Sequence, residues 1–170
     1  MSERVVKDDV TLLGGVRLSP AEMKVFLLRL GGENSATIAN QLGITQYSVW
    51  AYFSRVSEKA DKVDTRPKRQ VMAHMVLQAV VKGLVSYEGM SADLEFSKRE
   101  SKMVGLLLRG ADTGIIAHSL FFAKRTASLS LGDIDRKLGI YGTPNSRWLE
   151  RIGKLAYIGL MQLQRAALHE

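Results

Sequence analysis

The sequence predicts an all-α protein built from two tandem four-helix units. Three observations carry this prediction: the chain repeats itself, each copy begins with the same helix-capping motif, and each copy contains a short helix followed closely by a longer one. The expected segments are an N-terminal arm at 1–17, a first unit at 18–87, a linker at 88–95, and a second unit at 96–170 that ends in a long helix.

The repeat is visible when the chain is moved 78 positions along itself, which places 18–61 on 96–139 without a gap. Several aligned pairs that are not identical, such as Val25/Met103 and Val56/Ile134, place one apolar residue opposite another. We interpret the repeat as a duplication of one unit, against the alternative of chance similarity between helical segments. The identical pairs are Ser19/Ser97, Glu22/Glu100, Lys24/Lys102, Leu28/Leu106, Leu30/Leu108, Gly32/Gly110, Ile38/Ile116, Ala39/Ala117, Leu42/Leu120 and Lys59/Lys137.

The first helix of each unit is predicted from an S-x-x-E capping box, formed by Ser19 with Glu22 and by Ser97 with Glu100. In such a box, hydroxyl and carboxylate oxygens accept hydrogen bonds from backbone amides at a helix start. Apolar residues at helical spacing follow, and glycine at 31–32 and at 110 marks the predicted end.

The second and third helices follow at once. A short helix is predicted to open at Ser35 or Thr37 in the first unit, and at Asp112 or Thr113 in the second. Breaks at 43–45 and 121–123 separate these helices from longer ones at about 46–59 and 124–138. A short helix, a tight turn and a longer helix form the arrangement that places a recognition helix in the major groove of DNA.

The fourth helices are predicted at 69–87 and 145–168, after loops that contain Pro67 and Pro144. Each shows an apolar stripe at helical spacing. From Leu155 onward the last helix is apolar on almost every side, which is more than one core-facing stripe requires. Within the arm, VTLL at 10–13 is compatible with a short strand.

Composition narrows the function. The 24 basic residues outnumber the 17 acidic ones and give a formal charge of +7, which favours a polyanion, most simply nucleic acid, as the partner. The apolar fraction of 46% is sufficient for a core. The absence of cysteine excludes disulfides, thiolate metal sites and cysteine nucleophiles, and fits a cytoplasmic protein. No uncharged apolar run approaches the ~20 residues that span a bilayer, so we expect no membrane association.

Catalytic motifs are not found. The sequence contains no phosphate-binding P-loop, no G-x-S-x-G elbow and no H-E-x-x-H zinc motif. The three histidines, His74, His118 and His169, fall in different segments without metal-ligand spacing. We therefore expect no enzyme, no metal and no cofactor.

The second copy resembles the LuxR/GerE-type helix-turn-helix of bacterial transcription regulators. The residues that match the family pattern are Arg99, Glu100, Val104, Gly110, Ile116, Ala117, Leu120, Thr126, Ile134, Lys137, Leu138 and Gly139. The first copy is similar to the same family, and also resembles region 4 of a sigma factor. Its matching residues are Leu18, Ser19, Glu22, Gly32, Ile38, Ala39, Leu42, Ile44, Val49 and Lys59.

The resemblance implies a transcription regulator that binds double-stranded DNA and recruits or blocks RNA polymerase. Because the two copies occupy nearly everything after residue 17, we expect no separate sensor domain. Two positions on each recognition helix depart from the family, which commonly has Lys and then His there. The first copy has Trp50 and Tyr52, and the second has Ser128 and Ser130.

The candidate DNA-contacting residues lie on the two recognition helices and in the basic stretch DKVDTRPKR at 61–69. Basic side chains and helix-start amides can hold phosphates, whereas serine and tyrosine can hydrogen-bond to bases or phosphates. The basic stretch either follows a DNA backbone or remains a solvated loop. The candidates are Gln46, Tyr47, Ser48, Trp50, Tyr52, Arg55, Lys68, Arg69, Lys124, Arg125, Thr126, Ser128 and Ser130.

The alternative is a protein-interaction module that binds another regulator or RNA polymerase. Trp50 and Tyr52 lie beside Phe53, and aromatic residues are favoured anchors at protein interfaces. A third possibility is that one unit reads DNA while the other serves assembly.

LuxR-type domains generally dimerise through their fourth helix, which gives two alternatives for this chain. Either the two fourth helices of one chain pair as a pseudo-dimer, or the last helix pairs between chains in a homodimer. A pseudo-dimer would read an asymmetric pair of half-sites about one helical turn apart. The candidate pairing residues are Leu149, Ile152, Ala156, Leu160 and Leu163.

Overall fold

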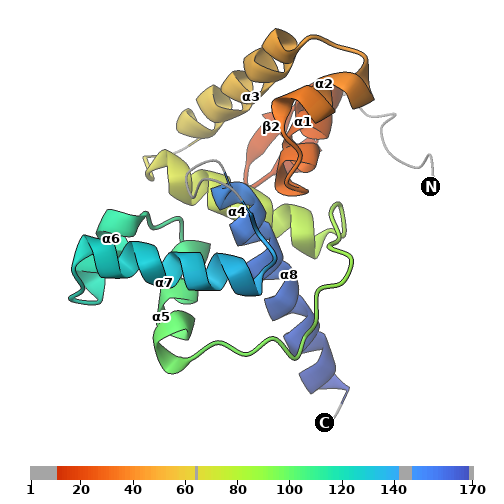
Figure 1. Cartoon of the computed structure of the whole chain (residues 1–170). Helices are drawn as coiled ribbons and strands as arrows, with labels where there is room; N and C mark the ends of the chain where they lie inside the picture. The colour runs from red at the N-terminus through yellow and green to blue at the C-terminus, as the bar shows by residue number, and fades with distance from the viewer. Residues whose placement is uncertain (1–10, 64, 142–146, 169–170) are drawn as a thin grey trace.

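Eight α-helices and one β-hairpin make up the part of the chain that the computed structural model describes, residues 11–63, 65–141 and 147–168 (Figure 1). The predominance of helix that the sequence predicts is confirmed. The first copy holds β1 (Thr11–Leu13), β2 (Val16–Leu18), α1 (Pro20–Leu30), α2 (Ser35–Leu42), α3 (Gln46–Asp61) and α4 (Lys68–Val81). The second holds α5 (Lys98–Leu108), α6 (Thr113–Ser119), α7 (Lys124–Lys137) and α8 (Trp148–Ala167). None of these helices is both long and apolar enough to cross a bilayer.

The hairpin belongs to the core of the first copy. β1 and β2 pair antiparallel, with Leu13 opposite Val16, and the two turn glycines both have positive φ, as a tight hairpin turn requires. Leu13, Val16 and Leu18 are all at most 1% exposed. The strand expected within VTLL is confirmed over Thr11–Leu13. Residues 13 and 16, which we expected in an arm, pack into the core because alternate positions of the hairpin face the helices.

The two capping boxes form as predicted. The Ser19 hydroxyl accepts from the amide of Glu22 at 3.3 Å, and the Glu22 carboxylate accepts from the Ser19 amide at 2.7 Å. Ser97 and Glu100 repeat both bonds at 3.2 and 2.7 Å. Each box therefore satisfies amide groups that a helix start would otherwise leave without a partner.

A lysine from the end of the third helix reaches each capping carboxylate. Lys59 Nζ lies 2.6 Å from Glu22 Oε2, and Lys137 Nζ lies 2.7 Å from Glu100 Oε2. The 78-residue shift relates both partners of one ion pair to both partners of the other. The repeat in the sequence is therefore also a repeat of three-dimensional contacts.

These ion pairs predict acid sensitivity. Burial works to raise the pKa of Glu22, but the hydrogen bonds from Lys59 and Ser19 outweigh it and lower that pKa below its ordinary value of 4.5. The hydrogen bond from Lys137 chiefly lowers the pKa of Glu100. A carboxylate whose pKa is lowered by folding stabilises the fold above its unfolded pKa, and this stabilisation is lost as the pH falls through the lowered folded value.

We therefore expect the free energy of unfolding, measured by urea titration, to fall as the pH drops below about 4.5. The double substitution Glu22→Gln and Glu100→Gln should lower stability at pH 7 and make the fall in stability at acidic pH less steep. Substituting the exposed Glu58 and Glu88 in the same way serves as the control. An equally steep fall of stability with pH in the Glu22→Gln, Glu100→Gln variant would contradict the prediction.

The second helices start where a side chain caps them. α2 begins at Ser35, as one predicted alternative has it, and it is capped by Asn34, whose Oδ1 accepts from the amides of Ala36 and Thr37 at 3.0 Å. In the second copy Asp112 caps α6, as one predicted alternative has it. The Asn34 cap was missed because Ser35, which follows it directly, is an equally good cap.

The breaks between the second and third helices differ between the copies. Gly43 has a φ of +63°, and its counterpart after the 78-residue shift, Phe121, has a φ of +55°. Glycine takes this left-handed conformation freely, whereas a bulky residue there is strained. The third helices run two residues beyond the predicted end in α3 and one residue short of it in α7.

The fourth helix of the first copy ends at Val81 rather than at the predicted residue 87. Gly83 has a φ of +67°, and its amide donates to the carbonyl of Val80, while the amide of Leu84 donates to that of Ala79. This is a glycine-terminated helix end. Periodicity missed it because Leu84 and Val85 still pack against the core from outside the helix. The predicted start of the last helix at Asn145 lies outside the described residues.

α4 and α8 pack against each other at the centre of the molecule, with the two copies on either side (Figure 1). Leu149 and Ile152 of α8 lie in the core of the first copy, beside Met72 and Val76 of α4. Farther along α8, Ile158 belongs to the core of the second copy. One helix thus contributes to both cores, and the fourth helices pair within one chain, as the first of the two pairing alternatives requires.

The contacts between the copies are reciprocal. Gly32, at the end of α1, packs against Glu150 in the first turn of α8. Gly110, at the end of α5, packs against the backbone of Arg69 in the first turn of α4. The 78-residue shift relates Gly32 to Gly110 and α4 to α8. In each copy, therefore, the equivalent glycine packs against the fourth helix of the other copy. This exchange is the pattern of a two-fold related pair.

Candidate nucleic-acid interface

The start of α7 carries adjacent exposed cations. Lys124 and Arg125 form its first turn, and within the described residues neither has a carboxylate in ion-pair range. Ala123 precedes them and provides no side-chain cap, so side chains leave the first amides of α7 unengaged. Unengaged amides and cationic side chains at a helix start together favour an anion. Of the other α7 candidates, Ser128 is exposed, while Thr126 and Ser130 are partly buried.

The start of α3 is neutral and aromatic. Tyr47 and Trp50 are 82% and 61% exposed, and Gln46 is exposed beside them. Ser48 is engaged in the cap, because its hydroxyl lies 2.9 Å from Thr45 Oγ1 and its amide donates to the same atom. The outward face of α3 therefore offers aromatic surface and a glutamine, without a cation in the first turn.

Tyr52 has a packing role. Its ring lies against the buried cluster of α1, α2 and α3, which includes Ile38 and Val49. The guanidinium of Arg55 stacks over this ring at 5.4 Å and stays exposed. Of the two, Arg55 is therefore the one that remains open to a partner.

The basic stretch separates into an exposed lysine and a sequestered arginine. Lys68 is exposed and pairs with Asp61 at 3.1 Å. Arg69 lies 4.6 Å over the ring of Trp148, from the other copy, and is only partly exposed. The sequence leaves Arg69 either along a DNA backbone or in a solvated loop; the structure places it against Trp148 of the other copy, and its contact with DNA stays a prediction. An arginine stem packs readily on an aromatic ring, and only the fold brings this ring near Arg69.

The candidate pairing residues of α8 divide in the same way. Leu149, Ile152 and Ala156 are buried within the chain, and Leu160 is partly buried. Leu163 is 71% exposed. The first three residues thus serve the internal core and its contact with α4, whereas Leu163 lies beyond it.

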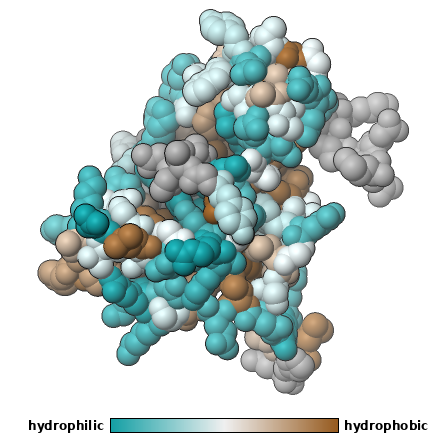
Figure 2. Space-filling model, viewed as in Figure 1, coloured by the Kyte–Doolittle hydropathy of each residue, from teal (hydrophilic) through white to brown (hydrophobic). Residues whose placement is uncertain are grey.

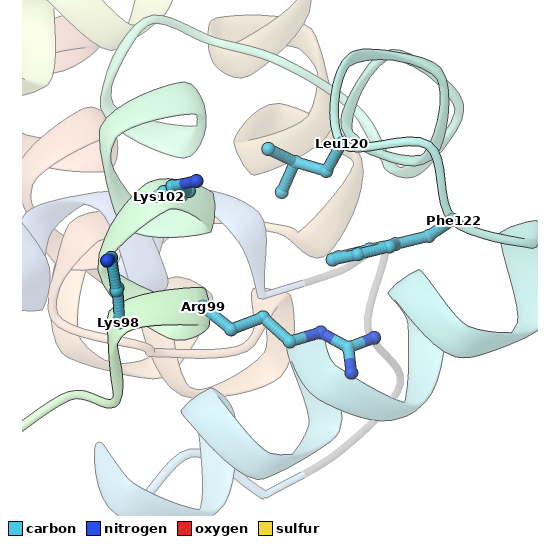
Figure 3. A pocket seen from close by; sticks show the side chains of 5 residues that line it. All are labelled: Lys98, Arg99, Lys102, Leu120 and Phe122. Carbon is cyan, nitrogen blue, oxygen red and sulfur yellow. The ribbon is translucent and has the colours of Figure 1, made fainter.

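A pocket beside α7 was not predicted. It has a volume of about 350 Å³ and lies between the start of α5 and the break before α7 (Figure 3). Arg99 stacks over the ring of Phe122 at 4.0 Å on one side of it. The next aromatic residue, Phe121, is 96% exposed. The signal in the sequence was the change from Pro20 and Ala21 to Lys98 and Arg99 in the aligned copies, which adds two cations at the start of α5.

The surface around these residues is mainly polar. Figure 2 shows that most of one face is hydrophilic and that apolar side chains interrupt it in separate places. Exposed apolar residues on α6, α7 and the break between them include Ile115, Phe121 and Leu129. Within the described part of the chain, no group of three or more metal-ligating side chains gathers.

No family model, curated protein or solved structure matches this chain significantly. The exposed residues of α3 and α7 and the packing of α4 against α8 are therefore the features that bear on function.

Proposed function

We propose that this protein is a sequence-specific, DNA-binding transcription regulator built from two tandem LuxR-type helix-turn-helix units. The exposed pair Lys124 and Arg125 carries the proposal, because it begins the second helix of a short-helix, turn, longer-helix arrangement. In this arrangement the start of the second helix meets the major groove. The formal charge of +7 adds a general attraction to DNA.

The mechanism is binding without catalysis. Lys124, Arg125 and the first amides of α7 hold phosphates, and Ser128 on the exposed face of α7 faces base edges. In the first copy, Gln46 and Arg55 are the polar contacts of α3, and Lys68 adds a backbone contact. The bound protein then recruits or blocks RNA polymerase.

The pairing of α4 with α8 determines the expected target. One chain presents two unlike recognition helices, so it acts as a pseudo-dimer whose two halves read different sequences. We expect an asymmetric site with its half-sites about one helical turn apart. Selection of bound duplexes from a random-sequence pool, at low and near-physiological salt, tests this directly. A shared asymmetric motif at both salts supports the proposal, and salt-sensitive binding without any motif would contradict it.

Removing the cations of α7 gives the sharpest test. We expect Lys124→Ala with Arg125→Ala to weaken binding to the selected duplex at least tenfold. The slope of log affinity against log salt should become shallower by about two, because each neutralised phosphate contributes about 0.9 to it. The matched control is Arg17→Ala with Lys82→Ala, which removes two exposed cations outside α3 and α7. An equal loss in both variants would show that only total charge matters.

A second candidate function follows from the exposed aromatic start of α3. Tyr47 and Trp50 present the kind of side chains that anchor protein interfaces, so the first copy is a candidate docking face for another regulator or RNA polymerase. If the protein is mainly an interaction module, Trp50→Ala will abolish binding to RNA polymerase in a pull-down with purified components, and duplex binding will be weak. Duplex binding lost in the Lys124 and Arg125 variant, with polymerase binding unaffected by Trp50→Ala, would exclude this candidate.

A further inference from the structure

The two copies have a pocket at the same place in the fold, and the pocket of the second copy has more basic residues in its lining. Each pocket lies between the start of the first helix and the break before the third, and the 78-residue shift relates the linings. The pocket of the first copy, about 290 Å³, is lined by Pro20, Ala21, Lys24, Leu42, Ile44 and Tyr52. The pocket of the second copy, about 350 Å³, is lined by Lys98, Arg99, Lys102, Leu120 and Phe122.

The two linings differ mainly in two ways: the second has more basic residues, and it lacks the aromatic ring that Tyr52 provides in the first. Lys98 and Arg99 stand where the first copy has Pro20 and Ala21, so one cation becomes three. Tyr52 lines the first pocket with its ring, whereas its counterpart at position 130 is a serine that does not line the second. The second pocket is therefore larger and more cationic, yet it keeps an apolar floor.

The three cations of the second pocket form no ion pair within the described residues, although Arg99 stacks on Phe122. In the part of the chain that the structure describes, Lys98, Arg99 and Lys102 have no carboxylate within ion-pair distance. The acid on the same helix, Glu100, is engaged by Lys137. Figure 3 shows the three basic side chains on one helix, with Arg99 extending beneath the ring of Phe122, and Leu120 and Phe122 on the opposite side of the pocket.

We propose that this pocket binds an acidic segment of a partner protein through one bulky apolar side chain. The apolar side chain packs on Leu120 and Phe122, and neighbouring carboxylates pair with Lys98, Arg99 and Lys102. The volume is near the lower end for ligand pockets, which fits one or two side chains better than a large cofactor. This inference goes beyond DNA binding and does not depend on it.

The apolar floor favours a peptide over a nucleic-acid backbone. Phosphates bind to exposed basic side chains without needing a cavity, and a phosphodiester chain has no apolar group with which to fill one. A Phe or Leu side chain gains free energy from leaving water, in proportion to its buried apolar area. Cations around an apolar pocket therefore match a segment that combines both kinds of side chain.

Synthetic peptides test the proposal with the full-length protein. The probe is a fluorescein-labelled 12-residue peptide of Asp and Glu that contains one Phe and one Leu, measured by fluorescence anisotropy at about 0.15 M salt, where long-range attraction is screened. We expect it to bind at least tenfold more tightly than two controls. One control replaces Asp and Glu with Asn and Gln, and the other replaces Phe and Leu with Ser.

The first copy supplies the substitutions. Lys98→Pro with Arg99→Ala gives the second pocket the residues of the first, and Pro20 shows that proline is accepted at this helical position. This variant should bind the acidic peptide about tenfold more weakly, from the loss of two ion pairs. Phe122→Ile, which copies Ile44, should also weaken binding. Thermal unfolding of each variant checks that the fold is kept, and Arg17→Ala with Lys82→Ala is the charge-matched control.

The outcomes separate this inference from the proposed function. Loss of peptide binding in the pocket variants, with the control intact, supports the pocket even if the duplex selection yields no motif. Equal binding of the serine-substituted peptide would overturn it, because charge alone would then suffice. It is also overturned if duplex DNA displaces the peptide and the Lys98 and Arg99 variant loses duplex binding to the same extent, since the site would then belong to nucleic acid.

Discussion

Replacing Gly110 with alanine should lower the free energy of unfolding by about 3 kcal/mol or more. Two costs add at this position. Gly110 has a φ of +82°, where an alanine is strained by about 1–2 kcal/mol. An alanine Cβ would also lie 2.6 Å from the carbonyl oxygen of Arg69 and 2.8 Å from the amide nitrogen of Gln70. These are backbone atoms of α4, so relief requires the two copies to move apart, and overpacking of this kind costs about 1–3 kcal/mol.

Gly139→Ala is the matched control. Gly139 also has a positive φ, +63°, but an added Cβ would meet nothing within 4 Å. It should therefore show the backbone strain alone, about 1–2 kcal/mol. Urea unfolding of both variants measures the difference between them, which reports the close approach of the copies. Equal losses would mean that the contact between α5 and α4 does not stabilise the fold.

Gly32→Ala tests the other half of the reciprocal contact. The atoms nearest to its added Cβ belong to the side-chain carboxylate of Glu150, at 2.6 to 2.8 Å, rather than to backbone. A side chain can turn away, but Glu150 is held by Arg147 at 2.9 Å and Lys154 at 3.0 Å. We expect a loss between those of Gly139→Ala and Gly110→Ala, measured by the same urea titration. A loss as small as that of Gly139→Ala would show that Glu150 moves freely.

Local features of the fold were predictable because their causes are local. The capping boxes need only a serine and a glutamate three residues apart, and the apolar stripes need only helical spacing. The apolar pattern alone missed the end of α4, because Leu84 and Val85 continue that pattern beyond Val81, although Gly83 is the local signal for the helix end. The same limit applies to the hairpin, whose burial depends on helices far along the chain.

The sequence predicted the candidate interface only for residues whose exposure follows from their position on a helix. Lys124, Arg125 and Trp50 lie on the outward side of their helices, as expected from the arrangement of the copies. The stacking of Arg69 on Trp148 was not predictable, because the ring comes from the other copy. The pocket of the second copy was missed for a similar reason. Its cations and its apolar floor lie on separate segments, α5 and the break after α6, and spacing along the chain does not show that they meet.

Replacing Arg151 with methionine should destabilise the protein by about 3–5 kcal/mol, because it leaves the buried carboxylate of Asp135 without its cation. Arg151 is 3% exposed and Asp135 is 8% exposed. Arg151 Nη2 donates to Asp135 Oδ2 at 2.6 Å, and Nε donates to Oδ1, so the pair is bidentate. The first copy has Ser57 and Ala73 at the corresponding positions, so the fold itself does not require this pair.

The double variant Arg151→Met with Asp135→Leu should lose less stability than the single one, since it replaces both charges with apolar groups. The surface pair on the same helix provides the control. Asp133 and Arg136 lie 3.1 Å apart with side chains 53% and 74% exposed, and Asp133→Ala should change stability by at most about 1 kcal/mol. Chemical denaturation of all three variants gives the comparison. If the double variant is as unstable as Arg151→Met, apolar side chains do not substitute for the buried ion pair, and the prediction is wrong.

The same pair links stability to the proposed function. It fixes α7, which carries Lys124 and Arg125, to α8, which pairs with α4. If this link sets the position of the recognition helix, the Arg151→Met, Asp135→Leu variant will bind the selected duplex more weakly than wild type while it remains folded. The loss should then fall on the half-site read by α7. Selection with this variant would show a motif whose other half is unchanged, whereas an unchanged motif over both halves would mean that packing alone holds α7 in place.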